Sequence, residues 1–455
     1  MLVYWEMTQA CGLACRHCRA EAVDTPHPNE LTTEEGKTLL RQIAAFNNPT
    51  PHLVFTGGDP LRRKDLFELI DEARSLGINA SITPSHPGRP STNPQHSSTH
   101  SYSEQPMLVY WEMTQACGLA CRHCRAEAVS TPHPNELTTE EGMNLLHQIA
   151  AFNNPTPHLV FTGGDPLRRT DLFELIDEAR SLGINVSITP SATTDLTYDV
   201  LAKLKAHGID SFGLSLDGSN AARHEAIRGV EGCFDWTVAA AQAAATLGVP
   251  IQIYTLVTEE TVDDIPAVYE LLKTSFPVMR WSLFFLIEVG RGKVLQPISS
   301  ERGEQLMNWV YDQSKTAPFA MATTEAPSYR RVALTRMREA GMVAAEIERT
   351  PVYRGFGIRD GHGIVFISNQ GDICPAGFLP LTLGNVRNDQ LQDIYRNAPM
   401  FQALHNPNLF KGKCGICEYR ALCGGSRARA FAATGDPLAS DPFCYYEPAA
   451  AELHV

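Results

Sequence analysis

The chain has 455 residues, of which 43% are hydrophobic and 20% charged, and a formal net charge of -13. This length suits two or three domains, and the composition is that of an ordinary globular protein. The negative charge argues against a nucleic-acid partner, because phosphate binding needs a positive surface. No apolar run approaches the roughly 20 residues that span a bilayer. We therefore expect a cytoplasmic protein with neither a membrane nor a nucleic-acid partner.

Eleven of the twelve cysteines lie in three spaced groups. The groups are Cys11, Cys15 and Cys18; Cys117, Cys121 and Cys124; and Cys374, Cys414, Cys417, Cys423 and Cys444. Disulfides are rare in a reducing compartment, so grouped cysteines predict metal or iron–sulfur binding. The lone Cys233 is expected to pack as a small apolar residue.

Residues 1–85 recur as residues 107–191 with six differences. The differing pairs are Asp24/Ser130, Lys37/Met143, Thr38/Asn144, Arg41/His147, Lys64/Thr170 and Ala80/Val186. So few differences indicate a recent tandem duplication or an artefact of gene assembly. Residues 86–106 between the copies are polar and rich in proline and serine, which predicts a disordered linker.

Strands and helices alternate from residue 107 onward. We predict strands at 108–114, 158–162, 186–189, 211–216, 251–257 and 280–286. Helices are expected from the capping box Thr138-Thr-Glu-Glu141, at 171–182, 198–206, 234–247 and 265–272, and from near Ser300. Six strands alternating with six helices predict an α/β fold with a parallel sheet, a partial (β/α)6 TIM-like barrel over residues 107–320. Its site should lie at the carboxyl ends of the strands.

The first copy holds only the first three strands of this array. Such a half-barrel leaves a sheet edge and helix faces uncovered, so it should be weakly stable alone. Residues 321–455 are predicted to form a separate, loop-rich and cysteine-pinned module. It contains a β-hairpin over 363–374 with its turn near Asn369–Gly371.

Three cysteines in a C-x3-C-x2-C pattern follow the first strand of the second copy, at Cys117, Cys121 and Cys124. Three thiolates can hold three corners of a cubane iron–sulfur cluster and leave the fourth iron open to a small molecule. Gly163-Gly-Asp165 follows the second strand and Ser215 and Asp217 follow the fourth, so these loops should converge on one rim. A zinc site completed by His123 or His133 is an alternative, and the glycines and Asp217 could simply form turns.

This combination resembles the radical S-adenosylmethionine (AdoMet) enzymes. The resemblance implies that Cys117, Cys121 and Cys124 bind a catalytic 4Fe–4S cluster whose open iron chelates AdoMet. One electron from a reductase, ferredoxin or flavodoxin would cleave AdoMet to a 5′-deoxyadenosyl radical that abstracts substrate hydrogen. The implied cofactor-binding residues are His123, Gly163, Gly164, Asp165, Ser215, Asp217 and Arg228. Asp165 stands where glutamate is commoner.

The C-terminal cysteines resemble the SPASM extension of that family, which implies one auxiliary 4Fe–4S cluster on Cys414, Cys417, Cys423 and Cys444. Cys374 is a possible fifth member, as substitute ligand, neighbour or bystander, and zinc is the alternative for this group. Cys11, Cys15 and Cys18 are not expected to support catalysis, because the first copy lacks the strands that would complete a cofactor site.

The tail from Cys423 to Cys444 is most similar to the alternative heme synthase and heme d1 biosynthesis branch. That branch removes or modifies propionate groups of iron porphyrins, and Arg427 and Arg429 would then pair with substrate carboxylates. A peptide maturase that forms a crosslink or thioether is a second reading. A non-enzymatic iron–sulfur electron carrier or redox sensor is a third.

Overall fold

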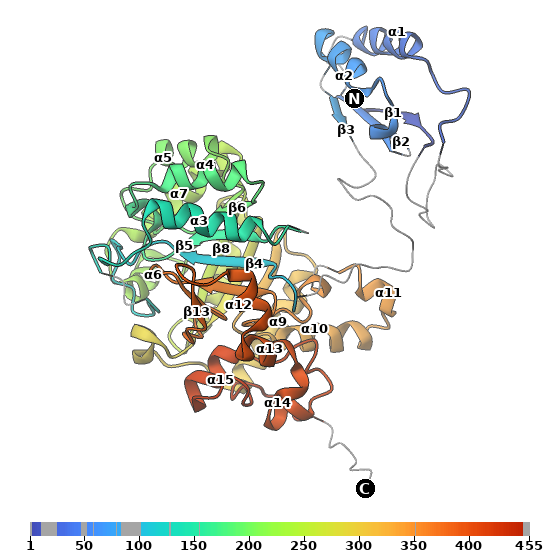
Figure 1. Ribbon diagram of the computed structural model, residues 1–455. Coiled ribbons are helices and arrows are strands. Elements are labelled where there is room, and N and C mark those ends of the chain that lie inside the picture. Colours follow the sequence, from blue (N-terminus) through green and yellow to red (C-terminus); the bar gives the residue numbers. More distant parts are fainter. Residues whose placement is uncertain are drawn as a thin grey trace. The chain divides into compact units, whose positions relative to one another are not determined.

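The computed structural model describes residues 2–10, 25–46, 52–57, 59–78, 80–82, 102–126, 129–153, 155–350 and 352–448. The chain forms two compact units, Met1–Thr99 and His100–Val455 (Figure 1). Cys11, Cys15, Cys18 and all but the last few residues of the predicted linker lie outside the described residues. None of the helices described is long and apolar enough to cross a membrane.

The first unit is a three-stranded parallel sheet with two helices. Its elements are β1 (Leu2–Thr8), α1 (Thr33–Ala44), β2 (His52–Gly57), α2 (Leu66–Ser75) and β3 (Ala80–Ile82), and the strand order is β1-β2-β3. Thr32 and Glu35 form the capping box that starts α1. The prediction that the first copy holds the first three strands of the array is therefore confirmed for its described residues.

The second unit is built on a ten-stranded sheet. Its strands are β4 (Leu108–Glu112), β5 (His158–Thr162), β6 (Val186–Ile188), β7 (Ser211–Ser215), β8 (Ile251–Val257), β9 (Arg280–Phe285), β10 (Ala320–Thr324), β11 (Ile364–Ile367), β12 (Asp372–Cys374) and β13 (Gly384–Asn385). The order along the sheet is β10-β9-β8-β7-β6-β5-β4-β11-β12-β13. The strands from β10 to β11 pair in parallel, and only the β11–β12–β13 pairings are antiparallel.

Helices connect successive parallel strands, as the sequence predicts. They are α3 (Thr139–Ala150), α4 (Leu172–Ser181), α5 (Tyr198–Ala206), α6 (Ala221–Arg228), α7 (Cys233–Leu247), α8 (Ile265–Ser275) and α9 (Ser300–Ser314), followed by α10 (Ser328–Glu339), α11 (Ala344–Ile347), α12 (Leu391–Asn397), α13 (Pro399–His405), α14 (Gly412–Ile416) and α15 (Arg427–Thr434). Helices α3, α4, α5 and α7 lie together along one side of the sheet, and α14 and α15 lie at the far end of the unit (Figure 1). The apolar faces of α3, α4, α5 and α7 share one core with the sheet.

The partial barrel is confirmed, and within the described residues the sheet does not close, since β10 and β13 are its edges. Two parts of it were not predicted. Strand β10 was missed because Ala-Met-Ala-Thr-Thr lacks the aliphatic run of the other strands. The hairpin was placed in a separate module, whereas β11 pairs with β4 inside the sheet. Its wholly apolar Ile-Val-Phe-Ile sequence suits a strand covered on both faces.

Candidate active site

A cavity of about 340 Å³ opens at the carboxyl ends of the parallel strands. Nearly all the residues predicted for the cofactor site line it: Cys117, Cys121, His123, Cys124, Gly163, Gly164, Ser215, Asp217 and Arg228. They come from the loops after β4, β5 and β7 and from the end of α6. The structure thus brings together residues more than 100 positions apart, as expected for a parallel sheet whose strand ends share one rim.

The sulfur atoms of the cysteine loop receive hydrogen bonds from nearby donors. The backbone amide of Leu119 donates to Cys117 Sγ at 3.3 Å. Arg228 Nη1 donates to Cys121 Sγ at 3.5 Å, while Ser191 Oγ, whose hydroxyl hydrogen is donated to Gly164 O, lies 3.2 Å from Cys117 Sγ. Such donors stabilise the negative charge of a thiolate and tune the potential of a bound cluster. This arrangement therefore fits thiolates that hold a cluster.

Gly163 and Gly164 let the loop after β5 lie against the cysteine loop. Gly163 has a φ of +138°, and a Cβ on Gly164 would lie 2.3 Å from the carbonyl oxygen of Ala116. The Gly164 amide donates to Thr114 O at 2.8 Å, and the next amide, that of Asp165, donates to Ala116 O at 2.7 Å. Only glycine permits this approach, so the pair fixes the start of the cysteine loop as well as lining the cavity.

Asp165 lies behind this wall and does not line the cavity. Its Oδ1 accepts hydrogen bonds from the amides of Leu167 at 3.2 Å and Ser191 at 3.3 Å. Burial raises its pKa to about 6. Its Oδ2 is buried and has no hydrogen-bond partner among the described residues, so the contact between this carboxyl group and a cofactor stays a prediction. Ser191, positioned by Asp165, donates to Gly164 O at 3.0 Å and faces the cysteine loop.

An ion pair lies beside the cysteine loop. Arg228 Nε donates to Asp217 Oδ2 at 2.6 Å, while Asp217 Oδ1 accepts from the amide of Leu256 at 2.7 Å. Burial acts to raise the pKa of Asp217, but Arg228, His123, His224 and the Leu256 amide together outweigh it and the pKa is lowered. Burial lowers the pKa of His123 to about 4, so that ring is neutral at neutral pH. Asp217 thus holds Arg228 where its guanidinium reaches Cys121.

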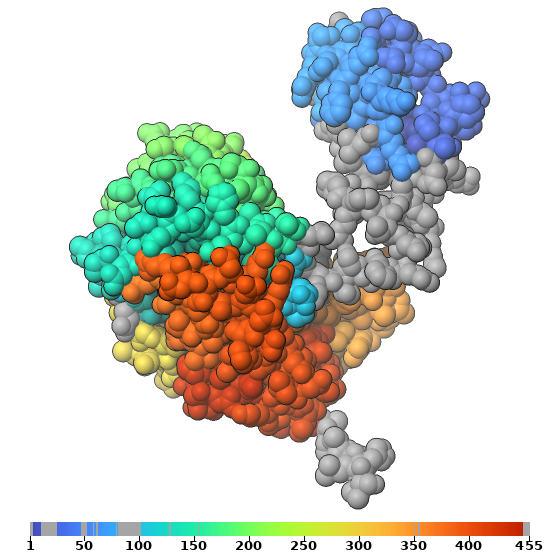
Figure 2. All heavy atoms as spheres, in the orientation of Figure 1, coloured from blue at the N-terminus to red at the C-terminus, as the bar shows by residue number. Residues whose placement is uncertain are grey.

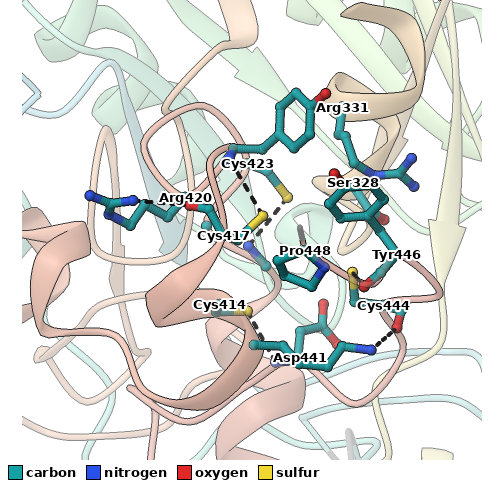
Figure 3. Close-up of a pocket in the computed structure, with 14 residues that line it drawn as sticks. Ser328, Arg331, Cys414, Cys417, Arg420, Cys423, Asp441, Cys444, Tyr446 and Pro448 are labelled. Atoms are coloured by element: carbon teal, nitrogen blue, oxygen red, sulfur yellow. Dashed lines mark hydrogen bonds between the residues drawn. The ribbon is translucent and has the colours of Figure 1, made fainter. Parts of the chain in front are cut away.

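The four C-terminal cysteines predicted to act together line a second pocket, shown in Figure 3. Cys414, Cys417, Cys423 and Cys444 surround one space in that view. Amides donate to three of the sulfurs at 3.4 Å, from Tyr419 to Cys417, from Gly425 to Cys423 and from Asp441 to Cys414. Backbone amides thus donate to cysteine sulfurs here, as the Leu119 amide does in the cysteine loop.

Cys374 lines neither cavity. It is buried on β12, where burial raises its pKa to about 12. Of the three roles left open for it, the structure favours that of a bystander. Cys233 is buried against Leu119 and Cys121, as predicted for a small apolar residue. His133, a possible zinc ligand, accepts instead from the amide of Asn135 at 3.1 Å.

Arg427 and Arg429 are not available to substrate carboxylates, which corrects that prediction. Arg427 is fully buried, donates to Ala439 O at 2.7 Å and Pro437 O at 3.0 Å, and reaches Cys414 Sγ at 3.4 Å. Arg429 is buried and contacts the Asp441 carboxylate at 3.4 Å. The sequence identifies both residues as cationic. It does not show that Arg427 binds backbone carbonyls and that Arg429 binds the Asp441 carboxylate.

Comparison with known proteins assigns the family. The model of the Radical SAM superfamily matches residues 5–94 and 111–272. The chain belongs to the radical SAM superfamily. It is 35% identical over 345 residues to the AdoMet-dependent heme synthase of Methanosarcina barkeri, covering 75% of this chain and 97% of that protein. It is 29% identical over 364 residues to the pre-heme d1 synthase of Dinoroseobacter shibae, covering 74% and 86%.

The fold agrees with this assignment. The structure of Streptococcus suis SuiB bound to S-adenosylmethionine matches with a TM-score of 0.58 and 17% identity, over 84% of each chain. Radical SAM membership makes the chain an enzyme and implies a 4Fe–4S cluster and AdoMet as cofactors. It also implies a substrate and an electron donor.

Several residues of this radical SAM cavity were missed by sequence reasoning. They are Tyr110, Arg125, Tyr254, Phe284, Arg291, Glu325, Asp360, Phe366 and Phe378. Arg125 Nη2 donates to Glu112 at 2.9 Å, and its guanidinium lies over the Phe366 ring at 4.6 Å. Tyr254 lies in the middle of β8, and Glu325 follows β10, which was itself not predicted, so position in the sequence gave no signal for either residue. The aromatic residues of the hairpin region gave none, because its pairing with β4 was not predicted.

Proposed function

We propose that this radical SAM enzyme acts on the propionate side chains of an iron tetrapyrrole. The observation that carries the proposal is its match to a protein named AdoMet-dependent heme synthase, of which it covers 97%. The cavity supports it, because aromatic residues suit a flat apolar macrocycle. These include Tyr254, Phe284, Phe366 and Phe378, beside the cationic Arg125 and Arg291.

Cys117, Cys121 and Cys124 would hold the catalytic cluster, and Gly163, Gly164, Ser215 and Asp217 would contact AdoMet. When bound, this pair of cofactors supplies a 5′-deoxyadenosyl radical that abstracts a hydrogen atom. The protein's own part is positional. Asp217 holds Arg228 against Cys121, and the glycines clamp the two loops together.

An auxiliary cluster on Cys414, Cys417, Cys423 and Cys444 is part of the proposal. Among the described residues, no three His, Cys, Asp or Glu side chains are grouped to hold a single metal ion. The ligands of one zinc ion all lie within about 2.3 Å of it, whereas the cysteines of a cluster bind different irons and surround a larger space. Four cysteines around one pocket therefore suit a cluster better than zinc.

Anaerobic incubation with reductant, AdoMet and iron coproporphyrin tests the proposal. A propionate becomes a vinyl group when one hydrogen atom passes to the 5′-deoxyadenosyl radical, one electron passes to an oxidised iron–sulfur cluster as acceptor, and carbon dioxide leaves. We expect 5′-deoxyadenosine together with a tetrapyrrole lighter by one hydrogen and one carbon dioxide. Release of 5′-deoxyadenosine with an unchanged tetrapyrrole would reject this substrate and favour the peptide maturase. Complete absence of 5′-deoxyadenosine from cluster-loaded protein would reject the catalytic assignment.

A further inference from the structure

Two acidic residues line the cavity in addition to the residues assigned to the cofactors. Glu325 follows the edge strand β10, and Asp360 precedes β11. Six strands, β4 to β9, separate β10 from β11 along the sheet order. The start of α15 nevertheless contacts both acids. Ser426 Oγ donates to Glu325 Oε2 at 2.6 Å, and the Ala428 amide donates to Asp360 Oδ2 at 2.9 Å.

The backbone of Glu325 is held in an unusual conformation. Its φ is +58°, and among the described residues Asn153 is the one other non-glycine residue with a positive φ. The left-handed region is unfavourable for a residue with a Cβ and persists where the surroundings impose it. The contact with Ser426 is such a constraint. The fold therefore accepts strain at the residue whose carboxyl group lines the cavity.

The charges around Glu325 favour its protonated form. Burial raises its pKa to about 8, and the neighbouring Asp360 adds to that effect. Asp441 acts in the same direction, while Ser426 and Arg429 oppose it. Burial also raises the pKa of Asp360, opposed by the Ala428 amide and by Arg427 and Arg429. Two nearby buried carboxyl groups retain a proton because both cannot ionise at low cost.

We propose that Glu325, supported by Asp360, holds a proton in the cavity and donates a hydrogen bond to a carboxylate of the substrate. This inference rests on the proposed function and names a substrate-binding residue for it. Arg427 and Arg429 face the protein interior, and Arg228 and Arg125 are bonded to Asp217 and Glu112. Arg291 is a further cation of the lining, so Glu325 would bind a carboxylate in addition to any that Arg291 contacts. A carboxyl–carboxylate hydrogen bond is short and strong because one partner is charged.

The test is a titration of the cluster-loaded enzyme with iron coproporphyrin and with its tetramethyl ester, followed by the porphyrin absorption band. The wild type should bind the free acid more tightly than the ester at pH 7. Its affinity for the free acid should fall as the pH rises through about 8, because the donor proton is then lost. The propionates stay ionised throughout this range, so the change reports on the protein.

Two variants of Glu325 test whether the side chain acts as a hydrogen-bond donor. Glu325→Gln keeps an N–H donor, so its affinity should stay near that of the wild type at pH 7 and should not fall at higher pH. Glu325→Ala removes the donor and should lower the affinity by about tenfold or more. Equal iron content in both variants shows that each has folded. The inference would be overturned if Glu325→Gln lost as much affinity as Glu325→Ala, or if it kept the pH dependence of the wild type.

The failure of the inference is distinguishable from failure of the proposed function. If the wild type converts the porphyrin while Glu325→Gln and Glu325→Ala bind it with equal affinity, only the role of Glu325 is refuted. A wild type that binds neither the porphyrin nor its ester refutes the substrate assignment, and the inference with it.

Discussion

The two copies within the chain have nearly the same sequence but different surroundings. Helices α1 and α3 begin with the same capping box, and Trp5 and Trp111 each pack on the glycine of the following helix. Phe46 is 59% exposed, whereas its counterpart Phe152 is 3% exposed. Local structure thus follows local sequence, while burial of the same side chain depends on what the rest of the chain supplies.

The covering of the second copy comes from residues about 240 positions later. Gln148 bonds to the backbone of Val386 at 3.1 Å and Leu391 at 2.9 Å, and Arg387 bonds to Glu141 at 2.6 Å. Figure 2 shows this C-terminal region (orange) lying directly against the start of the second copy (teal). None of the six sequence differences falls on these contact residues. The two copies therefore differ in the residues that surround them, although both have the side chains that make these contacts in the second copy.

The largest expected difference between the copies is in catalysis. Cys117→Ala should abolish 5′-deoxyadenosine release, because the cluster loses one of three ligands. Cys11→Ala should leave the rate within about twofold, since the first copy lacks the strands that would complete a cofactor site. Release measured by chromatography from equally reconstituted proteins checks both. A large loss in the Cys11 variant would show that the first copy takes part in catalysis.

Strong periodicity explains what the sequence predicted well. The predicted bounds of β5, β8 and α5 coincide with those observed, because apolar positions and caps mark them. Cysteine spacing grouped the C-terminal cysteines, and the resemblance to the SPASM extension separated the four that line one pocket from Cys374. Glu325 was missed with β10, whose small and polar residues resemble a loop.

Side-chain direction was the other failure. Asp165 and Arg427 sit in motifs that identify them as polar and near a site, but a motif does not show which way each side chain points. Arg427 turns to two backbone carbonyls, and Asp165 Oδ1 to two backbone amides, while Asp165 Oδ2 has no partner among the described residues. These partners come from neighbouring loops whose conformations depend on the whole fold.

The next effect concerns stability. Phe152→Ala should destabilise the second unit by about 3–5 kcal/mol, the usual cost of removing a buried aromatic side chain. Phe152 packs on Tyr395, with 6.0 Å between ring centroids. Phe46→Ala removes a mostly exposed ring and should change stability by no more than about 0.5 kcal/mol. Denaturant unfolding followed by tryptophan fluorescence compares the two variants, and equal losses would mean that Phe46 is covered in solution.

A smaller effect should follow from the ion pair that only the second copy makes. Hydrogen bonds from Arg387 lower the pKa of Glu141 to about 2. Because the folded pKa lies below the ordinary value, the stabilisation is present above about pH 4.5 and is lost as the pH falls toward 2. Glu141→Gln should cost about 1 kcal/mol at pH 7, allowing for solvent screening at this partly exposed site.

The matched variant is Glu35→Gln in the first copy. Glu35 retains the capping interaction with Thr32, which lowers its pKa, but its described partners include no arginine. The loss at pH 7 should therefore be smaller than for Glu141→Gln. Urea unfolding of both variants at pH 7 and pH 4 measures this, and equal losses would show that capping alone accounts for the effect.

The smallest expected change is in iron content when residues 1–101 are removed. Two 4Fe–4S clusters on the second unit require about eight irons per chain, and a third cluster on the first copy would raise this to about twelve. A cluster needs surrounding protein to exclude solvent, and the first unit supplies three strands where the second supplies ten. We therefore expect about eight irons before and after truncation. A fall of about four on truncation would show that the first copy binds a cluster without the rest of a barrel, so that burial and metal binding are separable in this sequence.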